Sequence, residues 1–190
     1  MVTDFDRRLA ELCRQQHGAF HQFTENDPPL AAQIATYWTG LNLPFPGVGT
    51  PWSGVFVCWC MKQAGATARE FKFSPRHAIY VKWAIDNLEA GSGLFRAHPI
   101  DAYRPLVGDI VQNNRSGGTI DYAHAAEHDN YESHCAIVVE TGTDSAGRYV
   151  RTIGGNETDT VGVKRISLDA DGSIQQRQRS PYICVIQSLK

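Results

Sequence analysis

The chain has no long hydrophobic run, no excess of one charge and no internal repeat. None of its 190 residues falls in an apolar stretch of about 18 or more, so no segment is expected to span a membrane. The formal net charge of -2 provides no basic patch, which argues against nucleic acid as a partner. Hydrophobic residues make up 42% and charged residues 20%, as is ordinary for a globular protein.

The cysteines form no recognisable framework. They are odd in number, widely separated and without a CxxC pair, so neither a disulfide scaffold nor a zinc knuckle is predicted. We interpret them as buried thiols and expect no cofactor. The five are Cys13, Cys58, Cys60, Cys135 and Cys184.

The N-terminus lacks the basic start and apolar run of a signal peptide. We therefore expect synthesis in the cytoplasm. If the protein acts in the periplasm or cell wall, it is expected to arrive there by a non-standard export route.

Four helices are predicted in the first half of the chain from apolar spacing and end signals. The third is apolar nearly all round, which is typical of a helix buried within a domain. The first predicted helix begins at Thr3 or Asp4, and the second runs from Pro28 to Gly40. The third runs from Trp52 to Ala64, and the fourth starts at Ser74-Pro75 and continues through Leu88.

About five strands are predicted in the second half, with a polar insert, residues 113–133, expected to be an exposed loop. Because helices precede strands without alternation, the fold class is α+β, with N-terminal helices packed on an antiparallel sheet. We expect a single domain, with residues 1–48 as a helical extension and 50–188 as the core. The strands are Leu106–Val111, Cys135–Glu140, Arg148–Ile153, Thr160–Ile166 and Tyr182–Ile186.

Three separated segments could together form a hydrolytic site. Ser53 follows a proline-containing loop at the first turn of the buried helix, where backbone amides and the helix dipole stabilise negative charge. His134 directly precedes a strongly apolar strand and could act as a base. Asn156, after Gly154 and Gly155, could orient an imidazole. Each has an ordinary alternative: a helix cap, a surface histidine and a turn.

Four motifs, in the same order, resemble the CHAP and NlpC group of papain-like bacterial peptidoglycan hydrolases. They are residues 51–65, which correspond to the stretch that carries the nucleophile, and Leu106–Val111, Ser133–Val139 and Ile153–Asn156. The resemblance covers roughly residues 50 to 165. One branch includes an uncharacterised bacterial domain family with Ser at the nucleophile position and a His-x-x-Tyr pattern, which His77 and Tyr80 match.

The resemblance implies a papain-like fold and an amidase or endopeptidase that cleaves peptidoglycan peptides. Ser53 would be the nucleophile, His134 the base and Asn156 the residue that orients it. From the residues themselves, we also expect Trp52, His77 and Tyr80 to line a substrate groove beside Ser53, although Tyr80, at helical spacing from Trp83, is an equally good core residue. Because the group normally uses Cys, Ser53 has three explanations: a true serine nucleophile, a domain that has lost hydrolysis, or an introduced Cys-to-Ser substitution.

Two other functions remain as alternatives. A catalytically degenerate domain would bind cell-wall fragments or a partner protein. His124, Glu127 and His128 spell H-x-x-E-H, the inverted signature of a zinc peptidase, although their flanks are too polar for a buried helix. If the peptidoglycan hydrolase is a secreted antibacterial effector, an inhibitor (immunity) protein is expected in the producing cell.

Overall fold

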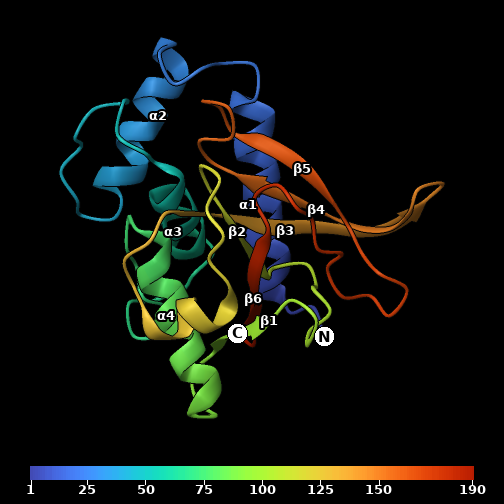
Figure 1. Ribbon diagram of the computed structural model, residues 1–190. Coiled ribbons are helices and arrows are strands. Elements are labelled where there is room, and N and C mark those ends of the chain that lie inside the picture. Colours follow the sequence, from blue (N-terminus) through green and yellow to red (C-terminus); the bar gives the residue numbers. More distant parts are fainter.

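The computed structural model describes residues 1–190 and shows helices followed by a sheet, so the predicted α+β class is confirmed (Figure 1). The helices are α1 (Asp4–Phe20), α2 (Pro28–Thr39), α3 (Ser53–Gln63), α4 (His77–Glu89) and α5 (Tyr122–Glu127). The strands are β1 (Phe95–Pro99), β2 (Ile110–Asn114), β3 (Ser133–Asp144), β4 (Gly147–Gly154), β5 (Gly162–Ser167) and β6 (Tyr182–Ser188). None of the helices has the length and apolar character needed to cross a membrane.

The first three helices form where the sequence predicts them. Thr3 caps α1 through a capping box, in which its hydroxyl accepts from the Asp6 amide and the Asp6 carboxylate accepts from the Thr3 amide. Pro28 opens α2, and Gly40 follows its last residue. Eight of the eleven residues of α3 are buried, as expected for a helix inside a domain.

Two predicted element starts are wrong by a few residues. Helix α4 begins at His77 because the Ser74 hydroxyl accepts a hydrogen bond from the Arg76 amide at 3.0 Å, which forms a turn instead of a cap. Strand β2 begins at Ile110 because residues 106–109 turn, with Gly108 at φ 97°. The Asp109 carboxylate closes this turn on the Leu106 amide at 2.7 Å.

Two elements were missed by the sequence prediction. Strand β1 is short and ends in a proline, so its residue pattern does not predict a strand. It lies at the edge of the sheet. The insert of residues 113–133 is not simply a loop, because it contains α5. Asp121 caps that helix by accepting from the His124 amide at 2.8 Å, and Ala125 is fully buried beneath it.

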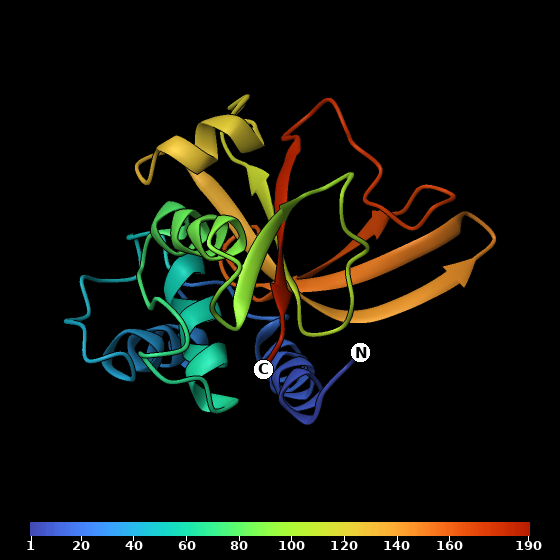
Figure 2. The ribbon, with the colours of Figure 1, turned by 90° about the horizontal axis from the view of Figure 1, so that it is seen from below.

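The six strands pair antiparallel throughout in the order β1-β6-β2-β3-β4-β5. The helices lie on one side of the sheet, with α2 packed on α3. On this side, 34 buried residues from every helix and every strand except β5 form the main core. A smaller cluster of seven residues lies on the opposite face under the connecting segments. Figure 2 shows the helices on one side of the sheet and the β3–β4 hairpin projecting beyond them.

Candidate active site

Ser53 is the first residue of α3, at the end of the helix that faces the sheet's central strands. Trp52 precedes it as the non-helical cap residue, with φ -113° and ψ 4°. The first hydrogen-bonded amide of the helix is that of Phe56, which donates to the Trp52 carbonyl at 3.0 Å. The amides of residues 53–55 are therefore unpaired, and they surround a serine whose exposed fraction is 2%.

Gly54 allows a second helix to approach Ser53 closely. A Cβ atom at Gly54 would overlap the Pro75 carbonyl, so no larger residue fits without a shift of the backbone. Pro75 lies two residues before His77, the first residue of α4. The glycine contact therefore helps to place the histidine beside the serine.

A hydrogen-bonded chain runs from Ser53 through His77 to Tyr80. The Ser53 hydroxyl lies 2.7 Å from His77 Nε2, and His77 Nδ1 is hydrogen-bonded to the Tyr80 hydroxyl. Burial, the nearby His134 and then Arg115 lower the pKa of His77 well below its usual 6.5. His77 is therefore neutral at neutral pH, the form in which an imidazole accepts a proton.

A second chain begins at His134, the second residue of β3. His134 Nε2 lies 2.7 Å from Glu157 Oε1, and the other oxygen of Glu157 pairs with Lys164 of β5. Burial alone would raise the pKa of Glu157, but His134 and Lys164 together lower it to about 2. Glu157 is thus a buried anion held between two basic groups.

The two histidines meet at the site, with ring centroids 5.6 Å apart. Gly154 makes room for this arrangement, since a Cβ atom there would lie 3.0 Å from His134 Nε2. His134 Nδ1 makes no hydrogen bond. The structure therefore brings Ser53 and His134 to one place, as predicted, but the histidine bonded to Ser53 is His77.

The role predicted for Asn156 is wrong. Its side-chain amide points to Glu25, at 3.4 Å, and Glu157 is the residue that binds His134. Asn156 has φ 56°, a left-handed turn conformation, and this turn directs the following side chain at the histidine. The only signal for Glu157 in the sequence is that it immediately follows the predicted residue.

Two of the three predicted groove residues are also wrong. Trp52 and Tyr80 are fully buried, and the Trp52 indole donates to Glu25 at 2.9 Å, so both belong to the core. His77 does line the pocket beside Ser53. This pocket has a volume of about 570 Å³. Its other lining residues are Pro51, Pro75, Arg76, Arg115, Ser116, Asn130, Tyr131, Glu132 and Ser133.

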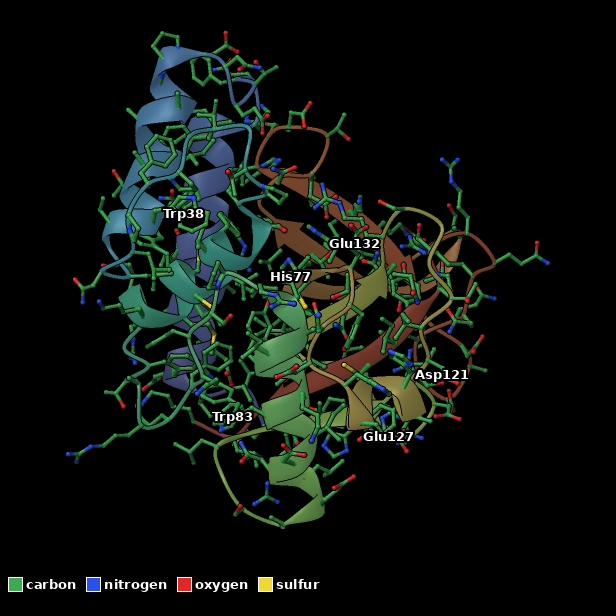
Figure 3. All side chains as sticks on the ribbon, turned by 60° about the vertical axis from the view of Figure 1, so that its left-hand side comes forward. Trp38, His77, Trp83, Asp121, Glu127 and Glu132 are labelled. Atoms are coloured by element: carbon green, nitrogen blue, oxygen red, sulfur yellow. The ribbon has the colours of Figure 1, made fainter.

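Figure 3 shows His77 at the first turn of α4, near Glu132 on the segment that leads into β3.

Residues 25–185 match the family described as an uncharacterized protein conserved in bacteria, DUF2272. The chain belongs to the DUF2272 family. No curated protein and no solved structure matches it.

The DUF2272 chain does not bring together the side chains needed to bind a metal ion. All five cysteines are free and buried, which confirms that they are core thiols. His124 and His128 stack on each other with ring centroids 4.1 Å apart, and Glu127 is exposed at the end of the short helix α5 (Figure 3). No group of three or more His, Cys, Asp or Glu side chains could hold a metal ion.

Proposed function

We propose that this protein is a serine-type amidase or endopeptidase that acts on the peptides of bacterial peptidoglycan. The observation that carries the proposal is the 2.7 Å hydrogen bond between Ser53 and His77, at the start of a buried helix and on the wall of a polar pocket. A serine hydroxyl is a poor acid, so it requires a base within hydrogen-bonding distance during attack. Ser53 has such a base.

The contact with Tyr80 allows the tautomer that this chemistry needs. Tyr80 is fully buried, and its hydroxyl is hydrogen-bonded to His77 Nδ1. In the proposed arrangement, the Tyr80 oxygen accepts from His77 Nδ1–H. His77 Nε2 then carries the lone pair that accepts the Ser53 proton. Tyr80 thus orients the base, the role that the sequence had suggested for Asn156.

In the proposed reaction, Ser53 Oγ attacks the substrate carbonyl while its proton passes to His77. The unpaired amides at the start of α3 bind the oxyanion, helped by the helix dipole. The C–N bond then breaks and the amine leaves with a proton, after which water releases the acyl group from Ser53. His134, oriented by Glu157, provides a second imidazole for the leaving amine or the attacking water.

The cell-wall substrate and the papain-like fold are proposed from the motif resemblance. Three of its segments meet around the site: the start of α3, the start of β3 and the turn after β4. A helix start that faces a histidine on an antiparallel sheet is the arrangement that the resemblance implies. Action in the periplasm or cell wall, and an inhibitor protein in a producing cell, follow from the same proposal.

Mass spectrometry of peptidoglycan digests tests the proposal. The native chain is expected to release stem peptides or cross-link fragments, and Ser53→Ala and His77→Gln are expected to abolish release. Ser53→Cys is expected to keep activity, because a thiol at this position is easily ionised by an imidazole. No release by either the native chain or Ser53→Cys, with fragment binding retained, would favour the degenerate binding domain instead.

A further inference from the structure

Arg115 is a cation on the pocket wall with no partner in the protein. It follows β2 directly and is half-buried, and its guanidinium makes no hydrogen bond, ion pair or cation–π contact. It lies close enough to His77 to lower the pKa of that imidazole, after the larger effects of burial and His134. A partly desolvated guanidinium is stabilised most strongly by a carboxylate or phosphate, which it binds through two parallel hydrogen bonds.

The loop that carries Arg115 is held in place. The fully buried Asn114 side chain donates to the carbonyls of Ile120, at 2.7 Å, and Pro181, at 3.0 Å, and accepts from the Ile120 amide at 2.8 Å. The Gly118 amide closes the loop on the Arg115 carbonyl at 2.9 Å. The guanidinium therefore extends from a fixed point at the end of β2, next to the strand that carries His134.

The remaining charges of the pocket leave Arg115 uncompensated. Arg76 lines the same pocket and is hydrogen-bonded to the neutral side-chain oxygen of Asn130. Glu132, the one acidic residue of the lining, is exposed and forms no ion pair with either arginine. Two guanidinium groups thus line the pocket, and neither is paired with a carboxylate of the protein.

We infer that Arg115 is a substrate-binding residue that selects peptides with a free carboxylate close to the bond that Ser53 attacks. The inference rests on the proposed function, because it places this carboxylate beside the Ser53–His77 pair. A bound carboxylate would supply the paired anion that Arg115 lacks. It would also screen the Arg115 charge from His77 and so make His77 a stronger base when substrate is present.

Binding in the Ser53→Ala background tests the inference without turnover. The probes are the stem tetrapeptide L-Ala-γ-D-Glu-L-Lys-D-Ala with free carboxylates and the same peptide with both carboxylates amidated, compared by calorimetry at one ionic strength. We expect the free-acid peptide to bind about tenfold more tightly than the amidated peptide, because one pair of charge-assisted hydrogen bonds provides a difference of about this size. Arg115→Gln should bring the two affinities within about twofold, whereas Arg179→Gln, an exposed arginine outside the pocket, should leave the ratio unchanged.

Equal affinities for the two peptides with Arg115 intact, or a preference that survives Arg115→Gln, would overturn the inference. Failure of the proposed function is seen separately, as peptidoglycan cleavage that continues in Ser53→Ala. Arg115→Gln in the otherwise native chain provides the catalytic readout. It should lower kcat/KM for the free acid by about tenfold and leave kcat/KM for the amidated peptide nearly unchanged.

Discussion

Replacing Glu157 by Gln removes a buried negative charge and keeps the shape of the side chain. The carboxylate lies between His134 and Lys164, and its pKa falls from the usual 4.5 to about 2. Since each pKa unit corresponds to about 1.4 kcal/mol, ionised Glu157 stabilises the folded protein by about 3 kcal/mol at pH 7. The Lys164 side chain is half-exposed, so solvent screens its part of this stabilisation.

The pH dependence follows from the direction of the shift. A carboxyl with a lowered folded-state pKa contributes its full stability above its unfolded value of 4.5, and loses it as the pH falls toward about 2. The contribution should therefore decrease from about 3 kcal/mol at pH 7 to about 1 kcal/mol at pH 3. If Gln behaves as a permanently protonated Glu, the stability difference between the native chain and Glu157→Gln should shrink in parallel.

Urea unfolding at pH 7, 5 and 3 measures this difference. Glu127→Gln is the matched control, because Glu127 is exposed at the end of α5 and makes no hydrogen bond, and it should change stability by less than about 0.5 kcal/mol. A difference between the native chain and Glu157→Gln that is the same at pH 7 and pH 3, or that is no larger than the control's, would refute the account of this pair.

Three further predictions concern the remaining parts of the site. Gly54→Ala should lower the free energy of unfolding by about 1–3 kcal/mol and reduce activity, because the new methyl group overlaps the Pro75 carbonyl and displaces His77. The control Gly18→Ala, in open space on α1, should leave activity unchanged and raise the free energy of unfolding by up to about 1 kcal/mol, because Ala favours a helix more than Gly does. Because burial, His134 and Arg115 lower the pKa of His77, the acid limb of the kcat/KM profile should lie below pH 6.5, and a limb at or above that pH would argue against His77 as the base. Dialysis against EDTA should leave peptidoglycan cleavage unchanged. If EDTA abolished cleavage and added zinc restored it, the result would instead support a zinc peptidase with His124, Glu127 and His128 as its motif.

The sequence predicted the fold class and most helix starts because these depend on local signals. The capping box at Thr3, the proline at the start of α2 and the apolar third helix are each contained within a few residues. Strand β1 and helix α5 carry weak local signals and owe their form to the elements around them. The edge strand β1 pairs only with β6, almost ninety residues later.

The site shows the same division between local and distant information. Ser53 and His134 were predicted because each stands at a recognisable position, a helix start and a strand start. The partners of these residues were not. His77 reaches Ser53 because of the contact between Gly54 and Pro75, and Glu157 reaches His134 because of the turn at Asn156. Such contacts depend on how separate segments pack, and residue spacing alone does not reveal them.

The central claim is that Ser53 is a nucleophile activated by His77. A fluorophosphonate, which reacts with activated serines, tests it directly when followed by intact-mass analysis and peptide mapping. The account predicts one adduct, on Ser53, which forms in the native chain and in His134→Gln but is lost or slowed at least about a hundredfold in His77→Gln. Absence of an adduct, an adduct on another residue, or equal labelling of the native chain and His77→Gln would contradict the claim.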